Sequence, residues 1–221
     1  MNGMNINNFP NSPFTDPRHG TTTIAAKFKD GVVVATDKRA SMGTFVASKK
    51  AEKLHELNKY TVVTIAGLVA DAQYLVNLTK ANLNLYELSR DYPPSTEMAG
   101  YLLSSIMYEQ FRSFFPYYVN MLVCGVDRKG PHVYFLDSSG SISDEDYAST
   151  GSGSMIAYGV LESSWKEGMS QKEALKLVIT ALKAAISRDT ATGDGMDVAI
   201  VTKKGIKRLT AKDIEKALTE E

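Results

Sequence analysis

A threonine that directly follows a glycine opens the first strand-like run of the chain, in "RHGTTTI" at residues 18–24. A threonine hydroxyl is a weak nucleophile until a base takes its proton. A threonine at a chain terminus carries its own base, because its α-amino group has an unperturbed pKa of about 7.7–8.0 and is partly neutral near physiological pH. Thr21 can work in this way only if residues 1–20 are removed.

Gly20 suits a self-cleavage that would remove them. Glycine adopts backbone conformations closed to other residues and leaves its carbonyl open to the next side chain. Attack of the Thr21 hydroxyl on the Gly20 carbonyl, an acyl shift to an ester and hydrolysis would release residues 1–20 and expose the Thr21 amine. Taken alone, the threonine triplet favours the simpler interpretation of a strand that starts after a loop.

Three further residues lie where they could support a terminal nucleophile. Asp37 ends an apolar run that pairs as a hairpin with the Thr21 run through the Asp-Gly turn at residues 30–31. Lys53 follows on the next segment. A lysine near the amine would lower the pKa of that amine, and a carboxylate beside the lysine would hold it charged and in place. Gly67 ends a strand-like run just before a helical pattern, where a backbone N–H can face a developing oxyanion.

The elements that must position these residues group as strands, two helices, strands, two helices, strands and a terminal helix. Apolar spacing predicts helices over 71–90, ended by Pro93 and Pro94, and over 95–114, and another helix after "TGSGS". A capping box at Ser170–Glu173 starts the helix that runs to about residue 187. Strands are expected over 21–29, 31–37, 44–48, 60–68, 118–127, 132–137, 196–202 and 206–209, and a terminal helix from residue 210. This grouping predicts one α+β domain, with antiparallel sheets covered by helices on their outer faces.

Composition excludes several classes of function. Lys and Arg total 25 and Asp and Glu total 25, so no charge excess indicates nucleic acid or an anionic membrane as a partner. No apolar stretch approaches the roughly 20 residues that span a bilayer, and residues 1–20 fit neither a signal peptide nor an anchor. Cys124 is the only cysteine and is expected to be a small buried hydrophobe, so we expect a cytoplasmic protein without an intrachain disulfide.

Metal and nucleotide sites are not expected either. The three histidines lie far apart in the sequence without ligand spacing, and "GSGS" lacks the Lys-Ser/Thr of a P-loop. We therefore expect no metal and no organic cofactor. The lysine-rich runs "SKKAEK" and "TKKGIKR" are expected to be solvated faces or turns.

Five motifs together resemble those of 20S proteasome β subunits, most closely the archaeal ones. They are "GTTTIA", "ATDKR", "TIAGLVAD", "YASTGSGS" and "SRDTATGDGMD", in the same order and at similar spacing, and the resemblance covers residues 21–221. It implies a four-layer αββα sandwich, the N-terminal nucleophile hydrolase fold, with residues 1–20 as a propeptide cleaved at Gly20-Thr21 and residues 21–221 as the catalytic domain.

The resemblance also implies the roles of the site residues. Thr21 is the nucleophile and its amine the base, Asp37 and Lys53 are the supporting pair, and the Gly67 N–H is the oxyanion donor. Ser152, Asp189 and Thr192 form a network around the amine; the family usually has serine where this chain has Thr192. Carried over by position, the substrate side-chain pocket is lined by Ala40, Ala51, Ile65 and Val69, and Ser41 is a candidate for hydrogen bonding to the substrate backbone.

The implied function is a threonine endopeptidase that degrades unfolded polypeptides inside an enclosed chamber. Its partners would be an α-subunit ring, other β subunits in heptameric rings and a regulatory ATPase. Because the pocket residues are small or apolar, we expect cleavage after large apolar residues rather than basic ones. The alternatives are a structural β subunit of the same ring without catalysis, the related bacterial two-ring peptidase and an unrelated amidase with a terminal nucleophile.

Overall fold

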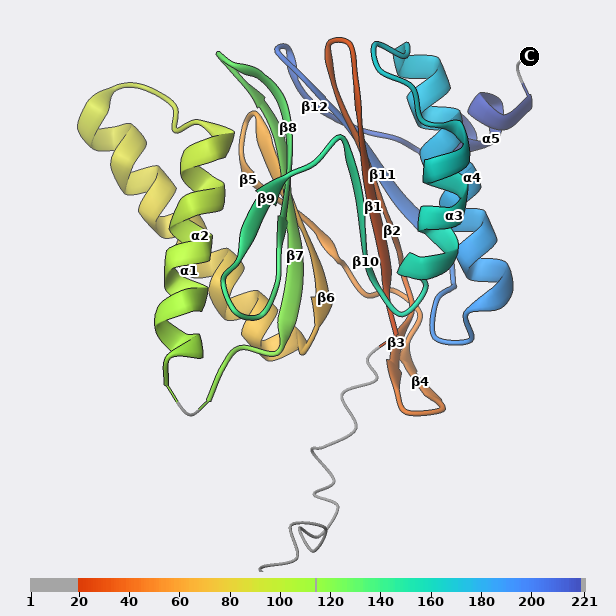
Figure 1. The fold of residues 1–221 in the computed structure, drawn as a ribbon, viewed down its shortest axis with the longest axis horizontal. Coiled ribbons are helices and arrows are strands. Elements are labelled where there is room, and N and C mark those ends of the chain that lie inside the picture. Colours follow the sequence, from red (N-terminus) through yellow and green to blue (C-terminus); the bar gives the residue numbers. More distant parts are fainter. Residues whose placement is uncertain (1–19, 114, 220–221) are drawn as a thin grey trace, which may run out of the picture.

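Two five-stranded antiparallel sheets pack face to face in the computed structural model, which describes residues 20–113 and 115–219 (Figure 1). The first sheet has the order β10-β1-β2-β11-β12, with β10 Tyr147–Gly151, β1 Thr22–Phe28, β2 Gly31–Asp37, β11 Met196–Thr202 and β12 Gly205–Arg208. The second has the order β5-β6-β7-β8-β9, with β5 Leu54–Asn58, β6 Thr61–Gly67, β7 Val119–Asp127, β8 Gly130–Leu136 and β9 Ile142–Asp144. The predicted pair of antiparallel sheets is confirmed.

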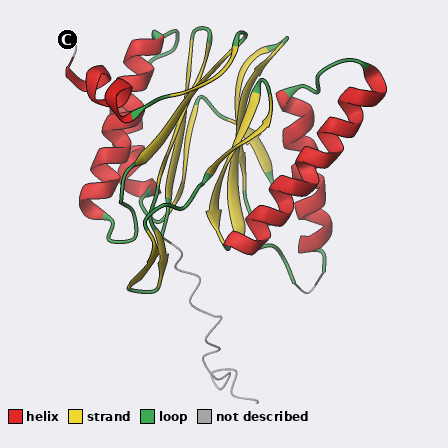
Figure 2. Ribbon diagram, turned by 180° about the vertical axis from the view of Figure 1, so that it is seen from behind, coloured by secondary structure: helices red, strands yellow, loops and turns green. Residues whose placement is uncertain are grey.

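Helices cover the outer face of each sheet, which completes four layers (Figure 2). The second sheet is covered by α1 Val69–Arg90 and α2 Thr96–Phe111, and the first by α3 Ser154–Ser164 and α4 Gln171–Arg188, while α5 Ala211–Thr219 packs against α4. The predicted capping box is present, because the Ser170 hydroxyl accepts from the Glu173 N–H at 3.3 Å and the Glu173 carboxylate accepts from the Ser170 N–H at 2.7 Å. Across the described ranges, no helix is long and apolar enough to cross a membrane.

Side-chain alternation along β1 assigns each position to one of two cores. Ile24, Ala26 and Phe28 pack against the helices of α3 and α4, whereas Ala25 faces the second sheet. Cys124 lies in the same core between the sheets, where complete burial raises the pKa of its thiol. The prediction that this cysteine is a buried hydrophobe is confirmed.

The strand predicted over 44–48 forms, but it does not join the main sheets. It is β4 Phe45–Ser48, which pairs only with β3 Ala40–Met42 in a separate hairpin that extends from the end of the sandwich (Figure 1). Phe45 is 66% exposed and no residue of β4 is buried, so this strand has no face that could join a core. The short strands β3, β5, β9 and β10 were not predicted, because their segments carry few of the β-branched residues that favour strands.

Candidate active site

The Gly20-Thr21 peptide bond lies at the entry to β1, and Thr21 is only 4% exposed. The Thr21 hydroxyl donates to the Gly20 carbonyl at 2.7 Å, and the Gly20 N–H donates to the hydroxyl of Ser41 at 2.8 Å. A Cβ at position 20 would lie 1.8 Å from the Cβ of Ala191, so only glycine fits there. Close packing is thus a second reason for glycine at position 20, besides the backbone freedom expected from the sequence.

Asp37 ends β2 with a completely buried carboxylate that is fully hydrogen-bonded. Its Oδ1 accepts from the backbone N–H of Thr22 at 3.0 Å, and its Oδ2 accepts from the backbone N–H groups of Arg39 and Gly193, each at 3.0 Å. The fourth donor is the Lys53 ammonium, at 2.7 Å from Oδ1. The neighbouring N–H groups and the lysine compensate the desolvation of this charge.

Lys53 is 4% exposed, which corrects the prediction that the whole "SKKAEK" run is solvated. Residues 49 and 50 are exposed as expected, but Lys53 turns inward because the buried Asp37 carboxylate can neutralise it. Its Nζ also lies 3.3 Å from the Gly20 carbonyl oxygen and donates to it. Burial lowers the pKa of Lys53, an effect that the charge of Asp37 opposes.

A second network surrounds the Thr21 nitrogen. The Thr21 N–H donates to the Ser152 hydroxyl at 3.3 Å, and that hydroxyl donates to Asp189 Oδ2 at 2.5 Å. Asp189 is the C-cap of α4, and its Oδ2 also accepts from the Thr192 hydroxyl at 2.5 Å. The Thr192 hydroxyl lies 2.7 Å from the hydroxyl of Thr22, whose position on β1 directs it to the helix side. The Thr192 hydroxyl therefore contacts both Asp189 and Thr22.

A cavity of about 350 Å³ opens beside Thr21. All four residues of the predicted side-chain pocket line it, together with Lys53 and Gly67, and those four are Ala40, Ala51, Ile65 and Val69. Ser41 is 4% exposed and contacts the Gly20 N–H instead of lining the cavity. The sequence did not predict the polar lining residues, which are Ser48, Glu52, His55 and Gln73.

Gly67 stands at the predicted junction, since β6 ends there and α1 begins at Val69. Its φ of +138° lies in the region that favours glycine, and a Cβ would meet the Tyr118 carbonyl oxygen at 2.2 Å.

Arg39 also supports the site, a role that the sequence did not predict. Its guanidinium donates to Asp194 at 2.7 Å and to the Thr190 carbonyl at 2.7 Å, and so ties the loop after α4 to the end of β2.

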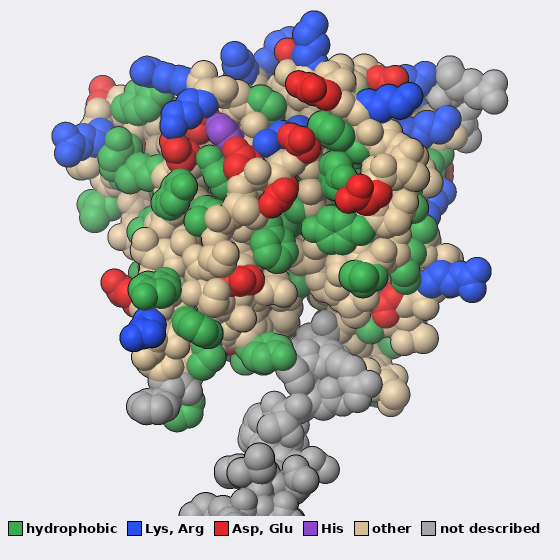
Figure 3. All heavy atoms as spheres, in the orientation of Figure 1, with side chains coloured by type: hydrophobic (Ala, Val, Ile, Leu, Met, Phe, Trp, Pro, Cys, Tyr) green, Lys and Arg blue, Asp and Glu red, His purple; other side chains and the backbone are tan. Residues whose placement is uncertain are grey.

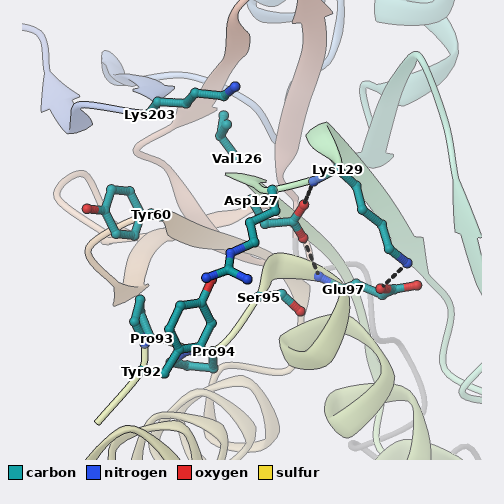
Figure 4. A pocket seen from close by; sticks show the side chains of 11 residues that line it. Tyr60, Tyr92, Pro93, Pro94, Ser95, Glu97, Val126, Asp127, Lys129 and Lys203 are labelled. Carbon is teal, nitrogen blue, oxygen red and sulfur yellow. Dashed lines mark hydrogen bonds and ion pairs between the residues drawn. The ribbon is translucent and has the colours of Figure 1, made fainter.

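A larger cavity, of about 620 Å³, lies at the far end of the second sheet and contains none of the predicted site residues (Figure 4). Tyr60, which precedes β6, lines this cavity, whereas Gly67 at the other end of β6 lines the cavity beside Thr21. In the lining of the larger cavity, Lys129 forms an ion pair with Glu97 at 2.6 Å. Across the residues with a described placement, no group of three His, Cys, Asp or Glu side chains could hold a metal ion.

Comparison with known proteins shows the family of the chain. A family model described as proteasome subunit matches residues 17–201. Proteasome subunit beta 1 of Korarchaeum cryptofilum is 44% identical over 203 residues, which cover 91% of this chain and 97% of that relative. Proteasome subunit beta of Methanocorpusculum labreanum is 45% identical over 86% of this chain and 89% of its own length, and that of Methanopyrus kandleri is 42% identical over 90% and 96%. The chain belongs to the proteasome subunit family, as a β subunit of the 20S core.

Proposed function

We propose that this β subunit is catalytic: a threonine endopeptidase that is made as a precursor and releases residues 1–20 by cleaving its own Gly20-Thr21 bond. The observation that carries the proposal is the approach of two groups to one carbonyl. The Thr21 hydroxyl lies 2.7 Å and the Lys53 ammonium 3.3 Å from the Gly20 carbonyl oxygen. A nucleophile and a polarising cation therefore meet at the bond that must break.

Self-cleavage would begin with addition of Thr21 Oγ1 to the Gly20 carbonyl carbon. The hydroxyl proton passes to the amide nitrogen, the C–N bond breaks, and an ester joins Gly20 to the threonine side chain. Water then hydrolyses the ester and gives a Gly20 carboxylate and a free Thr21 amine. The Ser41 hydroxyl, which accepts from the Gly20 N–H at 2.8 Å, holds the bond in position for this step.

The freed amine would then serve as the base for peptide substrates. It takes the proton from Thr21 Oγ1 as that oxygen attacks the scissile carbonyl, and it returns the proton to the leaving amine. Ser152 and Asp189 hold the amine, because the Ser152 hydroxyl lies 3.3 Å from the Thr21 nitrogen and 2.5 Å from Asp189. Thr192 adds its hydroxyl to that carboxylate, and the Gly67 N–H would stabilise the oxyanion.

Lys53 has a second part in this scheme. A nearby cation disfavours the protonated form of the amine, and Asp37 keeps the lysine in position at 2.7 Å.

The apolar wall of the cavity, with Ala40, Ala51 and Ile65 among its residues, favours large apolar side chains before the scissile bond. Fluorogenic peptides test this preference: faster hydrolysis after Arg than after Leu, Tyr or Phe would contradict it.

In the cell this subunit would work in the cytoplasm within heptameric β rings that stack between α rings. A regulatory ATPase would supply the enclosed chamber with unfolded polypeptide. Membership of the family supports assembly with other core subunits, and the ring arrangement and the ATPase are part of the proposal.

The decisive experiment is the intact mass of the chain after co-expression with its candidate α-ring partner. The wild-type chain should lose residues 1–20, Thr21→Ala should retain them, and Thr21→Ser should lose them because it keeps a hydroxyl. If wild-type and Thr21→Ala chains both keep residues 1–20 in an assembled particle, the catalytic proposal fails and the subunit is structural.

A further inference from the structure

The residues of the candidate active site are divided between the two sheets. Thr21 precedes β1 and Asp37 ends β2, and both strands belong to the first sheet. Lys53 precedes β5 and Gly67 ends β6, and both of these strands belong to the second sheet. The two sheets are separate ladders of hydrogen bonds. The distance between the Thr21 hydroxyl and the Gly67 N–H therefore depends on how one sheet is held against the other at this end of the sandwich.

Apolar packing between the sheets does not by itself set that distance. Ala25 and Val34 of the first sheet and Val62 of the second belong to the core between them. Apolar contacts are non-directional, so they oppose a separation of the sheets more than a small sliding of one over the other. On the face seen in Figure 3, basic side chains stand mainly along the upper rim, and few charged side chains reach the lower end, where β1 begins in Figure 1. Charged side chains on this face are thus mostly remote from the candidate active site.

A hydrogen bond between two buried threonines joins the sheets near the site. The Thr64 hydroxyl of β6 donates to the Thr23 hydroxyl of β1 at 3.0 Å, and the Thr23 hydroxyl lies 2.7 Å from that of Thr150 on β10. Thr23 and Thr64 are completely buried, and Thr150 is 2% exposed. Thr23 can accept from Thr64 and donate to Thr150, so the three hydroxyls form a chain. Because a hydrogen bond is directional, this chain fixes the position of β6 relative to β1.

Each end of the bond between Thr23 and Thr64 is close along its strand to a group of the proposed reaction. Thr23 lies two residues after Thr21, and Thr64 lies three residues before Gly67. A strand rises about 3.3 Å per residue, so each hydroxyl lies within about 10 Å along its strand of the group that it would position. A displacement of β6 at Thr64 is therefore passed on to the proposed oxyanion donor.

The lysine of the site is carried by the same strand. Thr64 pairs with Leu54 in the β5–β6 ladder, and the Ile65 N–H donates to the Lys53 carbonyl at 3.0 Å. Ile65 also lines the cavity beside Thr21. A displacement of β6 would thus move the oxyanion donor, the lysine and one wall of the cavity together, relative to the nucleophile on the first sheet.

We propose that Thr64 and Thr23 are positioning residues for the proposed protease, and that their hydroxyl pair sets the place of the Gly67 N–H and of Lys53 against the Thr21 hydroxyl. The inference rests on the proposed function and deepens it by naming residues that touch no substrate. A misplacement of about 1 Å can slow a reaction about 100-fold. Because the cavity wall moves with the oxyanion donor, substrate still binds when the pair is lost, but its carbonyl is misplaced against the nucleophile. The loss should therefore lower kcat and leave KM nearly unchanged.

Hydrolysis of a fluorogenic peptide cleaved after leucine, by particles assembled with the candidate α-ring partner, tests this inference. Rates are divided by the fraction of chains that have lost residues 1–20, read from intact mass. Thr64→Val removes the hydroxyl at nearly constant shape and should lower kcat at least tenfold, with KM within about twofold of the wild type. Thr64→Ser keeps the hydroxyl and should recover kcat to within about threefold. Thr23→Val breaks the same bond from β1, so the two valine changes together should lower kcat by less than the product of their separate effects.

The matched control is Thr61→Val, at the other end of the same strand. The Thr61 hydroxyl lies 3.1 Å from that of Thr96 on α2, and the two residues are 0% and 1% exposed. This change removes a buried hydroxyl pair of the same kind, so it should lower the stability by a similar amount. Because Thr61 is at the end of β6 away from Gly67, kcat should stay within about twofold of the wild type.

Three results with an active wild type would overturn the positioning role alone. They are an unchanged kcat in Thr64→Val, a Thr64→Ser variant as slow as Thr64→Val, and a loss of kcat in Thr61→Val as large as that in Thr64→Val. If Thr64→Val does not assemble, Thr23→Val decides by the same criterion of kcat and KM. A wild-type particle that keeps residues 1–20 and hydrolyses no peptide contradicts the proposed function instead, and the positioning role with it.

Discussion

Replacing Asp37 by asparagine should destabilise the fold strongly, although the two side chains have nearly the same shape. The Asp37 carboxylate is completely buried and accepts four hydrogen bonds, two on each oxygen. An asparagine has one acceptor oxygen and one NH₂ group. In either orientation its NH₂ group faces two donors, which are the Arg39 and Gly193 N–H groups or the Thr22 N–H and the Lys53 ammonium.

The magnitude follows from the two donors that lose their acceptor oxygen. Each buried donor left without a partner costs about 1–3 kcal/mol, so the substitution should lower the free energy of unfolding by about 2–6 kcal/mol. A typical domain has a total of about 5–15 kcal/mol, so this loss is a large fraction of the stability. Lys53 would also lose the charge that opposes its desolvation, so its pKa should fall further.

The assay is urea unfolding of the free chain, followed through the fluorescence of Trp165, its only tryptophan. All variants carry Thr21→Ala, so that the proposed cleavage cannot change the chain during the measurement. The control is Asp197→Asn, because Asp197 pairs with Lys38 at 2.9 Å but both side chains are partly exposed, at 24% and 32%. That pair should be worth no more than about 1 kcal/mol. An Asp37→Asn loss no larger than the Asp197→Asn loss would refute the reasoning.

Three further predictions concern single residues. Gly20→Ala should slow the removal of residues 1–20 at least tenfold in assembled particles, because the new Cβ would lie 1.8 Å from the Cβ of Ala191. Intact mass measures this removal, and a variant that is cleaved as fast as the wild type would contradict the prediction. The free energy of unfolding should rise with pH between the lowered pKa of Lys53 and its ordinary value of 10.5, because Lys53 is protonated there in the unfolded chain but not in the folded one. Urea unfolding at a series of pH values measures this rise, which should be absent in Lys53→Met. Cys124 should resist iodoacetamide until urea unfolds the chain, because burial raises the pKa of its thiol, and rapid labelling of the native chain would disprove this.

Much of the fold is predictable where local chemistry and tertiary packing agree. The Asp-Gly turn predicts the β1–β2 hairpin, and the capping box at Ser170 predicts the start of α4. Three of the four edge strands, β5, β9 and β10, are not predictable in the same way, whereas β12 overlaps the strand expected over 206–209. β5 reads "LHELN" and β9 reads "ISD", and these segments become strands because a neighbour supplies the ladder of hydrogen bonds rather than because of their own composition.

The candidate site, like the fold, can be predicted from the sequence only in part. Side chains with a distinctive chemical role, such as Thr21 and Lys53, can be picked out from the sequence. The backbone donors of Arg39 and Gly193 to Asp37 cannot, because every residue type except proline has an N–H and only the path of the chain brings it to the carboxylate. The inward direction of Lys53 is likewise decided by a partner 16 residues away, not by its lysine-rich neighbours.

The distances along the chain between the residues around Thr21 have a consequence for timing. The contact between the Thr21 nitrogen and Ser152 closes a sequence separation of 131 residues, and that between Asp37 and Gly193 closes 156. Contacts this far apart form only when most of the sandwich has folded, and they are slow to form. On the proposed function, a nascent or misfolded chain therefore cannot become a protease. Cleavage of Gly20-Thr21 would then occur only after the two sheets and the loop after α4 have come together, so a chain without residues 1–20 is one that has folded.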